Sequence, residues 1–135
     1  MRISVLWYVS AAVLFFLLIL LWIPAAKTIR QNDSAAVGRL RHLGEAQVHY
    51  AAQHPKEGFA CSLDDLSVTN PYSGYRFLLA CDPNPNGGER KYRLIAEPLE
   101  AGKTGERTYC LTEEGLIWYD EASSANCLAA RRPLS

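Results

Sequence analysis

The longest apolar run in the chain lies at its beginning. Residues 3–23 contain no Asp, Glu, Lys, Arg or His. As a helix rising about 1.5 Å per residue, this run is roughly 31 Å long, which matches the hydrocarbon core of a bilayer. The apolar region of a cleavable signal peptide is shorter, at roughly 7–15 residues, although Ala25 and Ala26 could mimic a cleavage site. We therefore expect an uncleaved transmembrane helix.

The apolar pattern changes after this run. Pro24 is expected to interrupt or kink the helix where it leaves the membrane, and Asn32, Asp33 and Ser34 offer an N-cap for a second segment. Apolar and weakly polar residues then recur at steps of three and four, as in an amphipathic helix that packs on one side. These residues are Val37, Leu40, Leu43, Gln47, Tyr50 and Ala51. His54, Pro55 and Gly58 end the segment.

The second half of the chain has the pattern of short strands joined by turns. DPNPNGG at residues 82–88 and the residues 112–115 are rich in turn formers. The predicted strands are 75–81, 91–96, 107–111 and 116–119. Because the helix precedes the strands, we expect an α+β fold in which a long N-terminal helix, transmembrane in its first half, packs on an antiparallel sheet of about four strands.

These patterns divide the chain into two parts. Residues 1–26 are predicted to form a transmembrane anchor helix, and residues 27–135 an extracytoplasmic α+β domain. Trp7 and Trp22 lie near the two ends of the apolar run, where aromatic residues anchor a helix at the membrane interfaces. We expect the lipid bilayer to be the partner of this helix.

Four cysteines bear on where the domain resides. Basic residues just after the apolar run favour a cytoplasmic domain, because Lys and Arg beside a membrane span are enriched on its cytoplasmic side. The cysteines, however, are even in number and spread through a small domain, as in proteins of oxidising compartments. We therefore expect a single-pass protein of the inner (plasma) membrane with its C-terminal domain outside the cytoplasm. The residues are Cys61, Cys81, Cys110 and Cys127.

Cysteine spacing leaves three disulfide pairings open. Pairing Cys61 with Cys81 and Cys110 with Cys127 would close two short loops, and this pairing is favoured. None of the four forms a CxxC pair, and no histidine lies at ligand spacing from them, so we do not expect zinc.

The charge pattern gives no sign of nucleic-acid binding. Lys plus Arg and Asp plus Glu both number 14, and the two signs are interspersed. Asp64 and Asp65 are adjacent and suit turns better than acid and base catalysis. Asp120 and Glu121 are candidates for calcium, but they belong to no spaced run of acidic ligands. We expect no cofactor, with calcium as the alternative, and no enzymatic activity because no nucleophile and base or metal set can be assembled.

Two longer stretches carry a resemblance to a known family. SAAVGRLRHLGEAQVHYAAQHPKEGFACSLDDL resembles the helix of type IV pilins and type II secretion pseudopilins, where it runs into a GF-containing loop. YRLIAEPLEAGKTGERTYCLTEEGLIWYD is similar to their sheet, with a TGxR step and a final EEG turn. The resemblance covers most of the chain and implies a pilin-like fold without enzymatic activity.

The sequence departs from that family at its beginning. Family members carry a leader that ends in glycine, then an aromatic residue and a glutamate a few positions into the helix. When the family's helix proline is aligned with Pro24, Arg2 stands in place of the glycine and Trp7 in place of the glutamate. This fits a noncanonical minor subunit, a pilin-like membrane protein that does not polymerise, or a true start that lies upstream.

Two functions are consistent with these observations. The first is a structural or assembly subunit of a type IV pilus-like or type II secretion pseudopilus-like system, whose partners are other pilin-like subunits or envelope assembly proteins. The second is a membrane-tethered binding module that recognises a ligand or an envelope partner without forming filaments. The absent leader motif favours the second.

Overall fold

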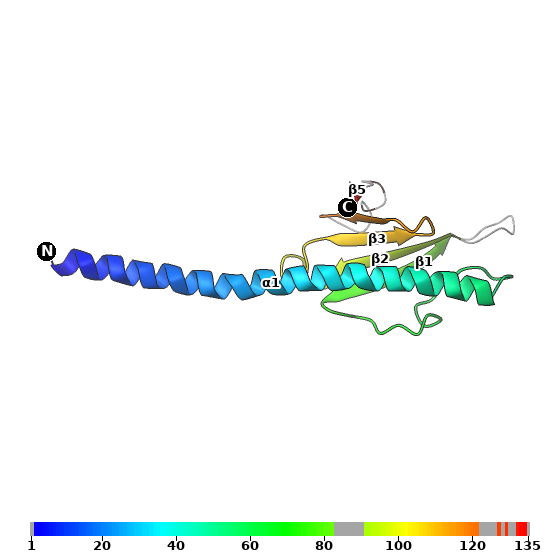
Figure 1. Cartoon of the computed structure of the whole chain (residues 1–135), viewed down its shortest axis with the longest axis horizontal. Coiled ribbons are helices and arrows are strands. Elements are labelled where there is room, and N and C mark those ends of the chain that lie inside the picture. The colour runs from blue at the N-terminus through cyan, green and yellow to red at the C-terminus, as the bar shows by residue number, and fades with distance from the viewer. Residues whose placement is uncertain (1, 83–90, 122–126, 128, 130–131, 135) are drawn as a thin grey trace.

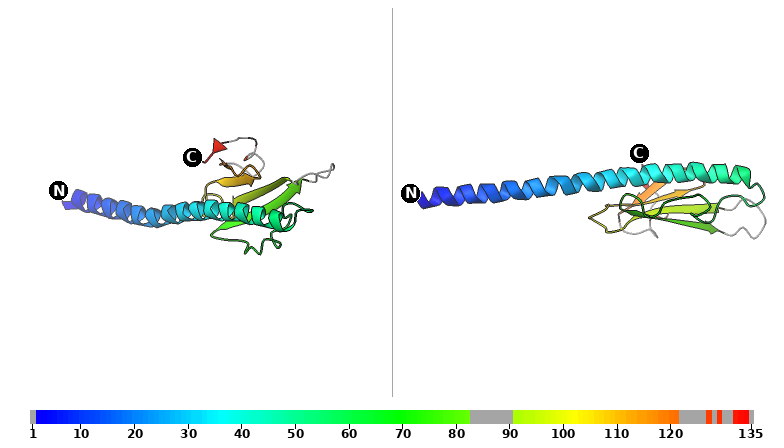
Figure 2. Two further views of the ribbon diagram at one scale, coloured as in Figure 1. Left: turned by 45° about the vertical axis from the view of Figure 1, so that its right-hand side comes forward. Right: turned by 90° about the horizontal axis from the view of Figure 1, so that it is seen from below.

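The computed structural model describes residues 2–82, 91–121, 127, 129 and 132–134, with the side chains of 2–7 and 21–27 excepted. A helix, α1 (Arg2–Gln53), is followed by the strands β1 (Tyr75–Asp82), β2 (Lys91–Pro98), β3 (Thr108–Thr112), β4 (Ile117–Asp120) and β5 (Arg132–Pro133). The N-terminal half of α1 projects beyond the sheet, and its C-terminal half lies along one face of the sheet (Figures 1 and 2).

The sheet is antiparallel, with its five strands in the order β1-β2-β3-β4-β5. The four predicted strands correspond to β1–β4, and each predicted end lies within two residues of the observed one. β5 was missed because a two-residue strand that includes Pro133 has no alternating pattern to detect. The DPNPNGG turn falls largely on residues 83–90, which lie outside the described part of the chain.

The core lies between the sheet and the C-terminal half of α1. Leu40 and Leu43 of the helix are buried against alternate residues of the strands, such as Phe77 and Leu94. Gly44 permits the close approach of the two layers, because a Cβ at that position would lie 2.8 Å from Leu111 Cδ2. The glycine weakens the helix by up to about 1 kcal/mol relative to alanine. Packing of the helix on β3 depends on it.

A buried glutamine joins the helix to the loop that follows it. Gln47 is fully buried. Its Nε2 donates to the carbonyl of Ala60 at 2.9 Å, and its Oε1 accepts from the amide of Ala60 at 2.8 Å. The side chain thus satisfies both backbone groups of a buried loop residue, which would otherwise lose their hydrogen bonds to water.

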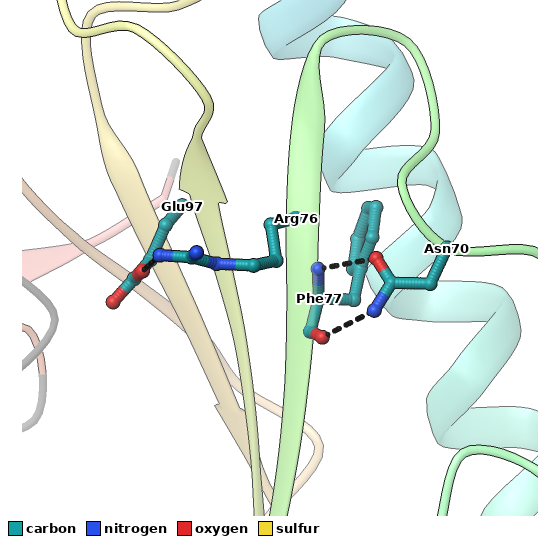
Figure 3. Close-up of polar contacts among 4 residues, drawn as sticks. All are labelled: Asn70, Arg76, Phe77 and Glu97. Atoms are coloured by element: carbon teal, nitrogen blue, oxygen red, sulfur yellow. Dashed lines mark hydrogen bonds and ion pairs between the residues drawn. The ribbon is translucent and has the colours of Figure 1, made fainter.

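The free edge of β1 is partly closed by a side chain (Figure 3). Asn70 donates from Nδ2 to the carbonyl of Phe77 at 2.8 Å, and its Oδ1 accepts from the amide of Phe77 at 2.9 Å. The amide group of Asn70 therefore occupies the place of a peptide group in a neighbouring strand. Arg76 is turned away from Asn70 and pairs with Glu97 of β2 at 3.0 Å.

The predicted membrane anchor is not supported. Within the part of the chain that the structure describes, no helix combines the length and the apolar character needed to span a bilayer. The transmembrane first half of the fold and the single-pass location in the inner membrane were therefore wrong.

α1 is not interrupted at Pro24, where a break or a kink was expected. Pro24 and the predicted boundary between residues 26 and 27 both lie inside α1. A proline removes one helical hydrogen bond, and a long helix that continues on both sides can accommodate that loss. Asn32 and Asp33 consequently lie inside the helix and do not cap a second segment.

Two disulfides are present, as the sequence predicted. They join Cys61 to Cys81 and Cys110 to Cys127, so that each closes a short loop. The first ties the loop after α1 to β1. The second ties the C-terminal region to β3, and both of its cysteines are fully buried. Such bonds are typical of proteins that fold in an oxidising environment.

Candidate functional site: an exposed apolar helix and its junction with the domain

Residues 8–20 of α1, here called the apolar segment, form the largest exposed hydrophobic surface among the described residues. Phe15 is 67% exposed and Phe16 is 65% exposed. The other large side chains of the segment are also exposed. They are Tyr8, Val9, Val13, Leu14, Leu17, Leu18, Ile19 and Leu20. A contiguous exposed surface of this kind marks an interaction site in a native protein.

The apolar segment is hydrophobic on every side. Residues 13–20 are consecutive large apolar residues, and successive helical residues are rotated by about 100°, so their side chains cover the whole circumference. A helix that is hydrophobic all round is normally buried on all sides. The segment therefore suits an environment in which several neighbours surround it, and it does not suit docking through one stripe.

A polar junction fixes α1 to the folded domain just before the helix reaches the sheet. Asn32 donates from Nδ2 to the carbonyl of Thr104 at 2.9 Å. Asp33 accepts at Oδ1 from the hydroxyl of Tyr75 at 2.5 Å and from the amide of Glu106 at 3.3 Å. These bonds link the helix to β1 and to the β2–β3 connection. They set the position from which the apolar segment projects.

Tyr75 is the central side chain of this junction. It is fully buried, and its hydroxyl lies 2.9 Å from the carbonyl of Arg107 as well as near Asp33. Burial raises the pKa of Tyr75 far above its usual value, and the hydrogen bond to the Asp33 carboxylate raises it further. Burial likewise raises the pKa of Tyr109 to about 12, with the Asp33 charge adding to the shift.

These tyrosines predict a loss of stability in alkali. The unfolded chain releases phenolic protons near pH 10, whereas the folded chain retains them. Because the unfolded state then binds fewer protons, the free energy of unfolding falls as pH rises above about 10. We expect a fall of up to about 1.4 kcal/mol per pH unit for each tyrosine, measured by urea unfolding between pH 9 and about pH 12.

The variant Tyr109→Phe provides the control for this expectation, since phenylalanine has no proton to retain. Its free energy of unfolding should decline less steeply between pH 10 and about pH 12 than that of the unmodified chain. Equal slopes for the two proteins would show that Tyr109 does not cause the decline.

The other predicted site residues do not come together. Among the described residues, no group of three His, Cys, Asp or Glu side chains could hold a metal ion. His42 is exposed and lies 3.3 Å from the carboxylate of Glu45 on the same helix. Asp120 accepts from the amide of Glu121 at 2.7 Å, which is a local turn contact. The side chains of Trp7 and Trp22 lie outside the described residues.

The sequence indicated the polar junction only in part. Asn and Asp are typical of helix N-caps, so Asn32 and Asp33 were interpreted as a cap. The same short polar side chains can also accept and donate across a fold, and sequence gives no sign of which partner is near. No local signal in the sequence distinguishes these two roles of Asn32 and Asp33.

No family model, curated protein or solved structure matches the chain. The resemblance to pilins and pseudopilins therefore stays a prediction from the residues and from the order of the elements.

Proposed function

We propose that the protein is a non-enzymatic structural or assembly subunit of a type IV pilus-like or type II secretion pseudopilus-like system. The observation that carries this proposal is the apolar segment, which is exposed on all sides and held away from the sheet by the rest of α1 (Figure 1). Subunits of this shape can bury their helices together while the folded domains stay outside.

Burial of the apolar segment supplies the driving force for assembly. Full burial of a Val, Leu, Ile or Phe side chain contributes about 1.5–3 kcal/mol relative to exposure. Contacts between copies would cover several such side chains on each helix. The free energy gained in this way exceeds the cost of the translational and rotational freedom that is lost on association. The partners are other copies of the chain or pilin-like subunits with a similar apolar helix.

A matched pair of substitutions on one helix tests the proposal. Val13 lies in the apolar segment and is 53% exposed, whereas Val48 lies beside the folded domain and is 64% exposed. Val13→Glu places a charge where neighbouring helices should pack, so we expect the concentration for half-assembly to rise at least about tenfold. Val48→Glu makes the same chemical change outside that surface and should leave the concentration unchanged.

The measurement starts from full-length protein kept dispersed in a mild non-ionic detergent. The detergent is then diluted, and assembly is followed by sedimentation velocity and by negative-stain electron microscopy. Regular filaments or small defined oligomers formed by the unmodified chain and by Val48→Glu, but not by Val13→Glu, support the proposal. An unmodified chain that stays monomeric, or two variants that assemble equally well, would refute it.

A further inference from the structure

The two disulfides differ in how open they are to solvent. Cys61 is exposed and Cys81 is half-buried, whereas Cys110 and Cys127 are both fully buried. A thiol reductant acts through a thiolate, which must reach one of the two bonded sulfur atoms. The buried bond can be reached only after the fold opens. Reduction of the folded protein should therefore be confined to the bond between Cys61 and Cys81.

The exposed disulfide ties a loop to the end of β1. Residues 61–69, here called the strap, lie along one flank of α1 (Figure 1). The strap begins at Cys61, which is bonded to Cys81 of β1. It ends before Asn70, whose side-chain amide is bound to Phe77. A disulfide that closes a loop of this length restricts the freedom of the chain between its cysteines.

The contacts within the strap are mostly local. The amides of Leu66, Ser67 and Val68 donate to carbonyls of Leu63 and Asp64. The φ of Ser67 is 52°, a conformation that is uncommon for residues with a side chain. The apolar side chains of the strap are only partly buried against the core. We therefore expect the shape of the strap to depend on the bond that ties it to β1.

A groove with a volume of about 480 Å3 separates the strap from α1. Asp65, Leu66 and Ser67 form the wall on the strap side, and residues such as Ala46 and His49 form the wall on the helix side. Movement of the strap away from β1 would widen this groove. It would also expose the apolar side chains that the strap now packs against the core.

We propose that Cys61–Cys81 is a redox-active disulfide, which a dithiol reductant opens in the folded protein so that the strap is released from β1. One thiolate of the dithiol attacks the Sγ of Cys61 and forms a mixed disulfide, while the S–S bond breaks and Cys81 leaves as a thiolate. The second thiol of the reductant then attacks the mixed disulfide and releases Cys61. The reductant ends as a disulfide, and its two electrons and two protons end on the two cysteine thiols.

Reduction of the full chain with dithiothreitol tests the first half of the proposal. The protein is kept in a mild non-ionic detergent without denaturant, samples are quenched at intervals, and free thiols are alkylated and located by peptide mass spectrometry. Cys61 and Cys81 should be alkylated at least about a hundredfold faster than Cys110 and Cys127, because the buried pair reacts only in the small fraction of open molecules. In urea all four should react.

Hydrogen exchange followed by NMR tests the release of the strap. After reduction, the amides of Leu66, Ser67 and Val68 should exchange at least about tenfold faster, because their hydrogen bonds lie within the strap. The amides of Ala60 and Phe77 are internal controls, since side-chain amides outside the strap hold them. Their exchange rates should stay within about twofold of those in the oxidised chain.

The double variant Cys61→Ser, Cys81→Ser provides the matched control, because it lacks the bond without any reductant. Its strap amides should exchange as fast as those of the reduced chain, and dithiothreitol should not change them further. The same experiment on the unmodified chain remains decisive whether or not this variant folds.

Three outcomes would overturn the proposal. Reduction of both disulfides at one rate, or of neither before urea is added, would refute selective attack on Cys61–Cys81. Selective reduction that leaves the exchange of the strap amides unchanged would refute the release of the strap. Loss of protection at Ala60 and Phe77 as well would show that reduction unfolds the domain and would refute a local release.

Discussion

Replacing Gly105 with alanine should lower the free energy of unfolding by about 3 kcal/mol. A Cβ at this position would overlap the hydroxyl oxygen of Tyr75 and would lie 2.5 Å from its Cζ. Tyr75 cannot swing aside, because it is fully buried and hydrogen-bonded to Asp33. Relief of the overlap would break that bond. Overpacking costs about 1–3 kcal/mol, and an unpaired buried polar group costs a similar amount.

Urea unfolding followed by circular dichroism measures this change. Gly38→Ala is the matched control, since a Cβ at Gly38 meets nothing within 4 Å. Because Gly38 lies inside α1, its replacement should raise the free energy of unfolding by up to about 1 kcal/mol. Opposite signs for the two substitutions are the expected result. A Gly105→Ala protein as stable as the unmodified chain would mean that the junction around Tyr75 is loosely packed.

The replacement of Gln47 with alanine should lower the free energy of unfolding by about 4 kcal/mol. The substitution leaves the amide and the carbonyl of Ala60 buried without their partners, at about 1–3 kcal/mol for each group. It also leaves a cavity beside the helix, which adds to the loss. Hydrogen exchange should show the amide of Ala60 losing protection before the amides of the sheet do.

Gln53→Ala removes the same side chain from an exposed position near the end of the same helix. It should change the free energy of unfolding by less than about 0.5 kcal/mol, as is usual for surface substitutions. Similar losses for Gln47→Ala and Gln53→Ala would mean that the bonds to Ala60 contribute little. Retained protection of Ala60 in Gln47→Ala would point the same way.

The elements that sequence located well are those with strong local signals. Tyr75–Asp82 and Lys91–Pro98 are bounded by turn formers, and their residues alternate between buried and exposed positions. The wrong predictions concern features that depend on distant partners. A run of apolar residues was interpreted as a membrane span, although such a run does not by itself show whether lipid or protein surrounds the helix.

Contacts between residues far apart in the sequence illustrate a second reason for the difference. Asp33 and Tyr75 lie 42 residues apart in sequence, and their contact depends on how the helix lies on the sheet. Arg93 and Thr112 meet only through the register of two strands. Neither pair has a spacing that could be recognised in the sequence. Gln47 was placed correctly on the inward face of the helix, but its role in binding Ala60 depends on the path of the following loop.

The contact between Asn70 and Phe77 matters most where many copies of the chain are crowded together. An open strand edge in such an array can pair with the edge of its neighbour, and sheets that merge in this way lead to amyloid-like aggregates. The side-chain amide of Asn70 already takes the hydrogen bonds that a foreign strand would need at Phe77. If the chain assembles as we propose, its copies can be concentrated through their helices while their sheets remain separate.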